Sequence, residues 1–382
     1  MKIAIAGHPT YGGSGVVAAE LGMALADRGH DVHFVSYQAP FRVNPLHPRV
    51  TFHEVEVTSY PLFKYPPYAL ALSNKLLSVI RDHGLDLIHA HYAIPHSIAA
   101  RLAQEMCRGC EVKTLTTLHG TDITLVGSDP SFFEITKFAI EQSDGVTAVS
   151  EFLAEASSER FELSKRVEVI PNFIDPDEYS PAHRDPDLRR CFADPDQTLL
   201  CHVSNFRPVK RVPDVIHTFA EISKKRPARL LMIGSGPEVT SAQALASSLG
   251  LADQITWLGA IDRVAEPLAC ADLFLLPSDS ESFGLAALEA MASGVPCVAT
   301  ASGGIPEVVV DGESGILREV GDFQGMAEAV LQLLETPEQL EKMGETARQM
   351  AIERFSLERI VRQYEAIYER LIDPSSSDTL LS

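Results

Sequence analysis

The sequence is short of positive charge. It has 32 Lys and Arg residues against 52 Asp and Glu residues, which gives a formal net charge of −20. This balance favours solubility and opposes general binding to nucleic acid or to an anionic membrane. An anionic substrate must therefore be held by a local cluster of donors, so basic residues near a glycine-rich turn are especially informative.

Membrane and export signals are also missing. No apolar run is long enough to span a bilayer, and the first seven residues do not form a secretory signal. Six scattered cysteines suit a reducing compartment. Cys107 and Cys110 have the spacing of a redox or half-zinc motif, but no second pair accompanies them, and a loop after a helix is the preferred interpretation. We therefore expect a cytoplasmic protein with no stable membrane association.

Short apolar runs alternate with helical patterns along most of the chain, and 382 residues exceed what one hydrophobic core usually supports. The runs are continuously apolar, as in a parallel sheet covered on both faces. The fold class is therefore α/β, with two doubly wound, Rossmann-like domains facing across a cleft. Buried strands are predicted at residues 3–6, 32–36, 85–90, 112–118, 199–204, 229–234, 255–258, 273–277 and 296–300.

The predicted domains are residues 1–168 and 169–352, joined by an irregular, proline-rich connector. An amphipathic helix at residues 353–372 is expected to pack back across the domain junction. The tail at residues 373–382 is expected to be flexible. The aromatic, proline-rich stretch at residues 60–68 could be a lid or a subunit contact, and the sequence does not choose between them.

The strongest functional signal is the pair Glu281 and Glu289, which follows a predicted buried strand. Ser282 is expected to cap a helix that contains Glu289, which places the two acids two helical turns apart, about 12 Å along the axis. That separation suits the two ends of one extended ligand, because a carboxylate accepts hydrogen bonds from neighbouring hydroxyls. The amides expected to meet an anion are those of Phe283, Gly284 and Leu285.

A second signal is the basic loop at residues 204–211, again just past a predicted strand. Arg207, Lys210 and Arg211 place three cations within five positions, before a helix that starts near Pro213. Such a cluster can stabilise the negative charge that develops on a departing diphosphate. The paired glycines Gly303 and Gly304 also follow a strand, where they could bring amides close to a phosphate or form a plain tight turn.

In the first half, Gly13, Ser14 and Gly15 lie between the first strand and the first helix and match a dinucleotide fingerprint only weakly. The second strand lacks the acid that a nicotinamide cofactor requires, so a phosphate or carboxylate is the better ligand. His89 and His91 share a strand face, which could suggest a metal, but satisfied core histidines are the preferred interpretation.

The Glu-x7-Glu spacing from Glu281 to Glu289 resembles that of the retaining family 4 glycosyltransferases, which have the GT-B fold. Residues 12–17, 65–68, 89–96, 116–124, 204–211 and 303–307 resemble a narrower branch that acts in bacillithiol biosynthesis. The resemblance implies that N-acetylglucosamine moves from UDP-N-acetylglucosamine to the hydroxyl of L-malate with retention of the α configuration. It implies no cofactor and no metal, and a homodimer is an open option.

The resemblance also implies roles for individual residues. Glu289 would hold the uridine ribose, Glu281 the sugar hydroxyls, Lys210 the diphosphate, and His119 the 6-hydroxyl of the sugar. The catalytic set is His119, Lys210 and Glu281. The donor-binding set is Gly15, Asn205, Arg207, Lys210, Arg211, Glu281, Phe283, Gly284, Leu285 and Glu289, and the acceptor-binding set is Gly13, Ser14, Tyr92 and Thr116.

Asn205 stands where the family usually has its first basic residue, so Arg207 or Arg211 must supply that charge, and we favour Arg211. With both acids occupied by hydroxyls, neither is free to be a nucleophile, which predicts front-face substitution. Three alternatives stay open: a related glycosyltransferase with an inositol phosphate, lipid or sugar acceptor, a nicotinamide oxidoreductase, and a non-catalytic protein that binds a nucleotide sugar.

Overall fold

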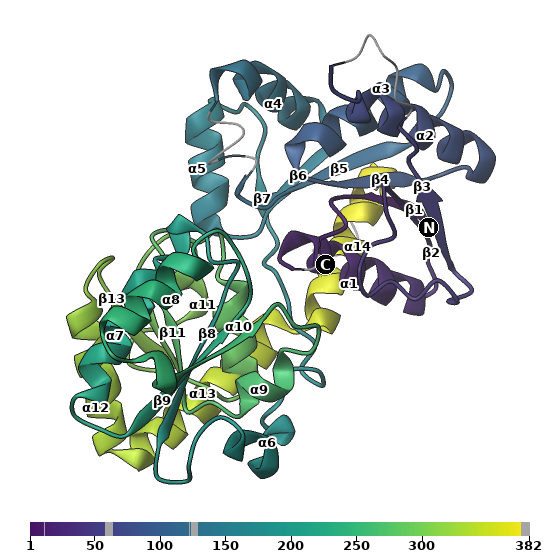
Figure 1. Ribbon diagram of the computed structural model, residues 1–382. Coiled ribbons are helices and arrows are strands. Elements are labelled where there is room, and N and C mark those ends of the chain that lie inside the picture. Colours follow the sequence, from purple (N-terminus) through teal and green to yellow (C-terminus); the bar gives the residue numbers. More distant parts are fainter. Residues whose placement is uncertain (11, 58–63, 122, 124–128, 376–382) are drawn as a thin grey trace. The chain divides into compact units, whose positions relative to one another are not determined.

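The computed structural model describes residues 1–10, 12–57, 64–121, 123 and 129–375 (Figure 1). The chain forms two compact units, of which unit 1 comprises Met1–Asn172 and Leu357–Ser382 and unit 2 comprises Phe173–Ser356. The sequence had suggested boundaries after residues 168 and 352. Residues 60–63 of the aromatic, proline-rich stretch and residues 376–382 of the tail lie outside the described residues.

Unit 1 is built on a seven-stranded sheet in the order β3-β2-β1-β4-β5-β6-β7. Every pairing in it is parallel, which confirms the predicted doubly wound class. The strands are β1 (Lys2–Ala6), β2 (Asp31–Ser36), β3 (Val50–Glu54), β4 (Leu87–His91), β5 (Lys113–Leu118), β6 (Gly145–Ala148) and β7 (Glu168–Val169). The strands β3, β6 and β7 were not predicted.

Helices cover both faces of this sheet (Figure 1). They are α1 (Ser14–Asp27), α2 (Tyr68–His83), the π-helix η1 (Ala93–Ser97), α3 (Ile98–Met106), α4 (Pro130–Gln142), α5 (Glu151–Phe161) and α14 (Leu357–Ile372). On one face, α2 and α3 share a buried apolar cluster with Val35 of β2 and Ile88 of β4. On the other, a Cβ on Gly22 of α1 would collide with the ring of Phe34, so the close approach of α1 to the sheet favours glycine there.

The C-terminal helix α14 belongs to unit 1 and packs against α1 and β5. Its apolar stripe is buried as its periodicity predicts, and Tyr364 and Tyr368 are almost fully enclosed. The hydroxyl of Tyr368 lies 2.8 Å from Nδ1 of His89 on β4, and Glu365 accepts a 2.8 Å hydrogen bond from Nε of Arg28, the C-cap residue of α1. The helix thus contributes part of the core of unit 1.

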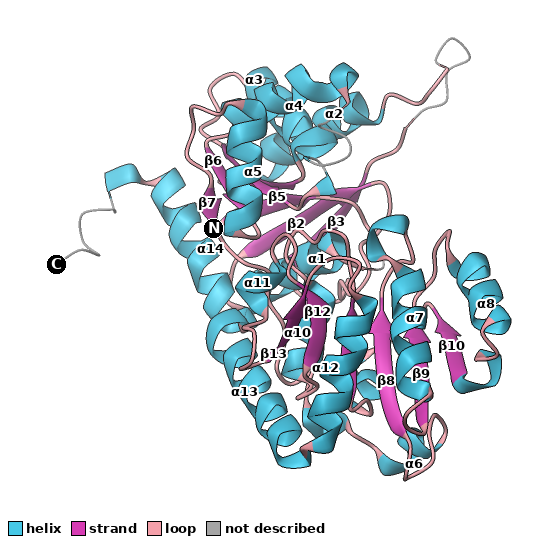
Figure 2. Cartoon of the chain, turned by 90° about the vertical axis from the view of Figure 1, so that its left-hand side faces the viewer, coloured by secondary structure: helices cyan, strands magenta, loops and turns pink. Residues whose placement is uncertain are grey.

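Unit 2 has a six-stranded parallel sheet in the order β10-β9-β8-β11-β12-β13 (Figure 2). The strands are β8 (Thr198–Val203), β9 (Ala228–Ile233), β10 (Ile255–Gly259), β11 (Leu273–Leu276), β12 (Cys297–Thr300) and β13 (Gly315–Arg318). All except β13 were predicted. The helices are η3 (Pro181–His183), α6 (Pro186–Arg190), η4 (Pro208–Lys210), α7 (Val212–Ser223), α8 (Val239–Ser248), η5 (Ala252–Gln254), α9 (Ala265–Ala269), α10 (Leu285–Ala292), α11 (Ile305–Val308), α12 (Phe323–Glu335) and α13 (Pro337–Phe355).

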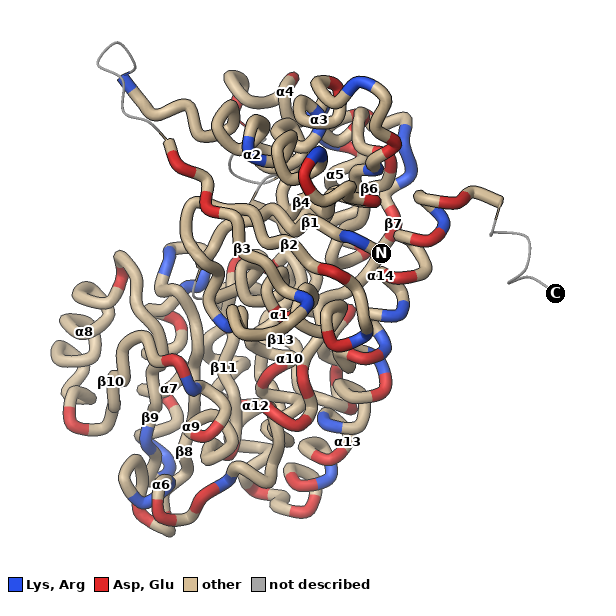
Figure 3. The backbone as a smooth tube through the Cα atoms, turned by 90° about the vertical axis from the view of Figure 1, so that its right-hand side faces the viewer, with Lys and Arg blue, Asp and Glu red and all other residues tan. Residues whose placement is uncertain are grey.

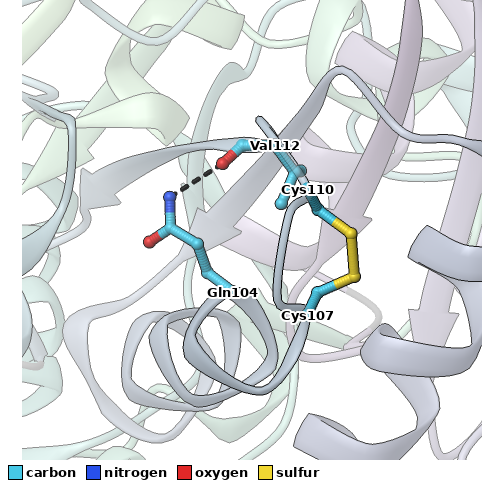
Figure 4. Close-up of a disulfide and its surroundings, with 4 residues drawn as sticks. All are labelled: Gln104, Cys107, Cys110 and Val112. Atoms are coloured by element: carbon cyan, nitrogen blue, oxygen red, sulfur yellow. Dashed lines mark hydrogen bonds between the residues drawn. A yellow bond between two sulfur atoms is a disulfide. The ribbon is translucent and has the colours of Figure 1, made fainter.

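Cys107 and Cys110 form a disulfide in the turn that follows α3 (Figure 4). Next to it, the side-chain amide of Gln104 donates a 2.7 Å hydrogen bond to the carbonyl oxygen of Val112, which holds the end of α3 against the start of β5 (Figure 4). The loop expected after a helix is confirmed. The disulfide corrects the rest of the sequence interpretation, which favoured a loop without sulfur chemistry.

Charged positions of both signs are interspersed along α13 and α14 (Figure 3). These two helices therefore carry no block of one sign of charge. Within the described ranges, no helix combines the length and the apolar character needed to cross a membrane.

Candidate functional site

In each unit the strand order reverses at one place. In unit 1 this is between the neighbouring strands β1 and β4, and in unit 2 between β8 and β11. Open α/β sheets bind ligands just beyond the carboxyl ends of the strands at such a switch point. The loops that follow these four strands are therefore the candidate site segments, and they contain most of the residues singled out from the sequence.

At the switch point of unit 2, Lys210 and Glu281 form an ion pair. Nζ of Lys210 donates to Oε1 of Glu281 at 2.6 Å, and the hydroxyl of Ser278 donates to the same oxygen at 2.8 Å. The two charged side chains are only 19% and 13% exposed, so solvent screens their attraction less than it would on an open surface. Two residues predicted to contact the same donor thus lie in direct contact.

The Glu281 loop rests on the paired glycines. The amide of Gly304 donates a 2.8 Å hydrogen bond to the carbonyl oxygen of Glu281, and a Cβ on Gly303 would collide with that same oxygen. Gly303 also has a φ of +58°, which disfavours other residues. These glycines let the loop after β12 approach the backbone of the loop after β11, which fixes the position of Glu281.

The predicted cap of α10 is wrong. The helix begins at Leu285 with Gly284 as its N-cap, and the cap makes no side-chain hydrogen bond. Gly284 has a φ of +101°, a left-handed conformation that glycine adopts at lower cost than serine does. Residues 281–284 are not helical, so the 12 Å separation expected from helical rise does not apply. Glu289 lies half-buried in the second turn of α10.

The basic loop is held by acids of unit 2. Arg211 is the N-cap of α7, where Nε donates a 2.6 Å hydrogen bond to Oδ2 of Asp214, and Nη1 lies 3.9 Å from Oδ1 of Asp279. The amide of Asp279 donates to the carbonyl oxygen of Val209 at 2.8 Å, which ties this loop to the one after β11. Arg207 is exposed. The helix predicted to start near Pro213 is confirmed as α7.

At the switch point of unit 1, Ser14 and Tyr92 lie in contact. The hydroxyl of Ser14, the first residue of α1, is 2.5 Å from that of Tyr92, which follows β4. Tyr92 has a φ of +85° and a ψ of +139°, a region that residues other than glycine rarely occupy and that is often found at functional sites. Two residues of the predicted acceptor set are thereby brought together.

The two glycines that flank Ser14 differ in their surroundings. Gly13 is exposed, has a φ of +58° and stands at the N-cap of α1 without a side-chain cap. Gly15 is buried, and a Cβ there would collide with the backbone of His8 and Thr10. Gly13 thus leaves the helix start open, whereas Gly15 lets the loop after β1 pack on the helix.

A cluster of histidines lies beside Tyr92. Nδ1 of His91 is 2.9 Å from Nε2 of His119, and the rings of Tyr92 and His119 have centroids 5.2 Å apart. Burial lowers the pKa of His119 to about 3 and that of His91 well below its usual value. Both imidazoles are therefore neutral near pH 7. His8 and His96, whose ring centroids are 4.5 Å apart, extend this cluster and were not singled out from the sequence.

His89 and Thr116 are core residues in this structure. Nδ1 of His89 lies 2.8 Å from the Tyr368 hydroxyl and Nε2 lies 2.7 Å from the Thr117 hydroxyl, which confirms the satisfied core histidine. Thr116 is fully buried, and its hydroxyl donates to that of Ser97 at 2.8 Å. Thr116 thus lies behind the Tyr92 loop within a network of hydroxyls.

Two family models cover the chain. The model of glycosyltransferase family 4 matches residues 11–178, and that of glycosyl transferases group 1 matches residues 185–350. Among solved structures, Anabaena HepE in complex with UDP and glucose aligns with a TM-score of 0.80 at 22% identity, over 96% of this chain and 99% of its own. This likeness shows the fold, which is GT-B.

Two curated relatives cover nearly the whole chain. N-acetyl-alpha-D-glucosaminyl L-malate synthase of Bacillus anthracis is 48% identical over 96% of each chain. D-inositol 3-phosphate glycosyltransferase 2 of Catenulispora acidiphila is 29% identical over 95% of this chain and 91% of its own. The chain therefore belongs to the family 4 glycosyltransferases, in the group that contains the N-acetyl-alpha-D-glucosaminyl L-malate synthase of Bacillus anthracis.

Proposed function

We propose that this glycosyltransferase moves N-acetylglucosamine from UDP-N-acetylglucosamine to the hydroxyl of L-malate and keeps the α configuration. The observation that carries the proposed chemistry is the Lys210–Glu281 pair at the switch point of unit 2. The choice of substrates is supported by the Bacillus anthracis relative, whose name specifies this sugar and this acceptor. The two supports are independent, since one is geometric and the other is a sequence comparison.

In the proposed donor site, Lys210 contacts the diphosphate and Glu281 accepts from hydroxyls of the sugar. Their ion pair keeps the ammonium group close to the carboxylate before the donor arrives. Glu289 accepts from the ribose diol, because one carboxylate can accept from two neighbouring hydroxyls. The amides at the start of α10, from Phe283 to Leu285, face the phosphates, where a helix N-terminus favours an anion.

The second cation of the proposed donor site is Arg211. It adjoins Lys210 at the N-terminus of α7, and Asp214 restrains its side chain, whereas Arg207 is exposed. Asn205 adds no charge. A restrained guanidinium needs less ordering when the diphosphate binds than a freely moving one.

The proposed reaction proceeds on one face of the sugar. The bond from the anomeric carbon to the UDP oxygen breaks, and a bond from that carbon to the malate hydroxyl oxygen forms. The hydroxyl proton passes to the departing phosphate oxygen, and Lys210 stabilises the negative charge that remains. In this proposal Glu281 acts through hydrogen bonds and not as a nucleophile, and its Oε1 is already an acceptor for Lys210 and Ser278.

In the proposed acceptor site, Ser14, Tyr92 and the amides at the open N-terminus of α1 bind the malate carboxylates. Gly13 keeps that terminus uncapped. His119 is neutral near pH 7 and contacts the sugar as a hydrogen-bonding group without adding charge. Thr116 supports the site through the hydroxyl network behind the Tyr92 loop.

The second candidate is transfer to inositol phosphate, which the name of the Catenulispora acidiphila relative suggests. The test is to incubate the purified chain with UDP-N-acetylglucosamine and each of L-malate, D-malate, L-lactate, citrate and inositol 1-phosphate, and to measure UDP release. We expect release with L-malate. Release with inositol 1-phosphate alone would favour the second candidate. Binding of UDP-N-acetylglucosamine without UDP release in the presence of any of these acceptors would indicate a non-catalytic binding protein.

A further inference from the structure

Three histidines converge on the sheet of unit 1, outside the switch point of that sheet. His33 lies on β2, His53 on β3, and His83 is the last residue of α2. In the register of the sheet, His53 pairs with Val35, two positions along β2 from His33. Side chains two positions apart on a strand share a face, so all three rings lie on the face that α2 covers.

The ligand atoms of these three side chains are close together. One nitrogen from each ring can be chosen so that all three lie within 4.8 Å of one another. Nδ1 of His33 and Nε2 of His53 are 2.9 Å apart, and the His33 and His83 rings have centroids 4.5 Å apart. Nitrogen ligands about 2.0–2.1 Å from a tetrahedral zinc ion are about 3.3 Å from each other. Small rotations of the side chains would therefore bring all three nitrogens to a metal.

From this geometry we propose that His33, His53 and His83 bind a divalent transition-metal ion of the zinc class, at a site separate from the glycosyl-transfer machinery. Imidazole suits Zn²⁺, Co²⁺, Ni²⁺ and Cu²⁺ better than it suits Mg²⁺ or Ca²⁺. Three protein ligands leave at least one position for water. The metal would join β2, β3 and the end of α2, so its role would be to stabilise this edge of unit 1.

The state of the ligands agrees with this proposal. Burial lowers the pKa of His33 to about 4 and also lowers that of His53, so both rings are neutral at pH 7, as metal ligands must be. In the metal-free protein, one of the two nitrogens that face each other at 2.9 Å carries a proton and donates it to the other. Metal binding replaces that hydrogen bond, and the ring that donated it changes tautomer, so that its proton moves to the nitrogen that does not face the metal.

Neighbouring groups hold the frame of the site. Lys2 donates a 2.8 Å hydrogen bond from Nζ to the carbonyl oxygen of His83, which ties the end of α2 to β1. Asp31, two positions before His33, forms a 2.8 Å ion pair with Arg49. Neither contact uses an imidazole nitrogen, so the contacts that set the frame would survive metal binding.

The proposal is tested on the full chain after treatment with a chelator and its removal. Zn²⁺ is titrated by calorimetry, and Co²⁺ is used as a spectroscopic probe because its visible bands report tetrahedral nitrogen coordination. We expect saturable binding of one Zn²⁺ at this cluster, which His83→Ala weakens at least tenfold. His47→Ala is the matched control, since His47 is a half-buried histidine of unit 1 outside the cluster, and we expect unchanged binding.

Thermal unfolding gives a second readout. Zn²⁺ should raise the unfolding midpoint of the unmodified chain and leave that of His83→Ala unchanged, because a ligand stabilises only the state that binds it. His83 lies half-buried at a helix end, so its alanine variant is expected to fold and to keep UDP release. Absence of saturable binding would overturn the proposal. So would equal binding by His83→Ala, or loss of binding in His119→Asn, which would assign the metal to the histidines beside Tyr92.

Discussion

The ammonium group of Lys210 lies 2.6 Å from a carboxylate oxygen of Glu281, and this contact joins the loops that follow β8 and β11. These strands are neighbours at the switch point of unit 2, where the strand order of the sheet reverses. A cation for the diphosphate and an acceptor for the sugar hydroxyls are therefore held together by the protein before any donor binds. The proposed catalysis depends on this pair.

Replacement of Lys210 by alanine should lower kcat by about 10²- to 10³-fold, because the charge on the departing diphosphate loses its nearest cation. Lys210→Arg should recover part of the rate. Steady-state rates of UDP release measure both. Lys224→Ala is the control, since Lys224 is an exposed lysine of unit 2 paired with Glu221. A Lys210→Ala variant as active as this control would remove the proposed role.

Replacement of each of the two glutamates should change the affinities for UDP and UDP-N-acetylglucosamine differently, as measured by calorimetry. Glu289→Ala should weaken both ligands about 10- to 100-fold, because it removes a charged acceptor from the ribose. Glu281→Gln should leave UDP affinity unchanged or higher, since it releases Lys210 from its ion pair. In the same variant, the affinity for UDP-N-acetylglucosamine relative to that for UDP should fall, because the sugar hydroxyls lose their charged acceptor. Equal effects on UDP from both changes would contradict the assigned roles.

Ser14 and Tyr92 should act as a unit in acceptor binding. Ser14→Ala and Tyr92→Phe each remove one hydroxyl of the 2.5 Å contact and should raise KM for L-malate several-fold. The double variant should cost less than the two single costs combined, because the single variants already break the shared hydrogen bond. KM for the donor should change little. Strict additivity, or a shift in donor KM alone, would place the acceptor elsewhere.

Much of this arrangement follows from sequence pattern. Continuous apolar runs placed most strands, and glycine or basic loops just past them marked Gly13, Lys210 and Glu281 as site residues. Residues that follow the carboxyl ends of neighbouring parallel strands lie at the same edge of a sheet, whatever the length of chain between the strands. The contact between Lys210 and Glu281 needs one further fact, that β8 lies beside β11, and sequence pattern alone does not give strand order.

Other features could not be predicted from local pattern. Ser282 has a side chain that could cap a helix, yet the N-cap of α10 is Gly284, whose backbone there has a left-handed φ. The strand β7 has two residues, too few for a periodic signal. The convergence of His33 and His53 depends on the register between β2 and β3, and β3 itself was not predicted.

Buried histidines should make unit 1 sensitive to acid. Burial lowers the pKa of His89 from 6.5 to about 3, so the folded state binds fewer protons than the unfolded state between these values. The stability that His89 contributes is present above pH 6.5 and is lost as the pH falls toward 3, by about 1.4 kcal/mol per pH unit at most. His89→Gln should unfold with a smaller pH dependence over this window.

Thermal unfolding of both proteins from pH 7 to pH 4 measures that difference. His202 in unit 2, whose pKa burial lowers to about 4, provides a second case through His202→Gln. The His202→Gln variant also tests the prediction if the His89→Gln variant does not fold. Identical pH dependence in the unmodified chain and in both folded variants would show that these histidines do not set the acid sensitivity.

The central claim is the transfer of N-acetylglucosamine to L-malate with retention, and the product itself tests it most directly. UDP-N-acetylglucosamine and L-malate are incubated with the chain, and the product is examined by mass spectrometry and by the anomeric proton coupling in its NMR spectrum. The account predicts a malyl N-acetylglucosaminide with the α configuration. A β-linked product, a trapped covalent glycosyl–enzyme intermediate, or no glycoside despite UDP release would contradict it.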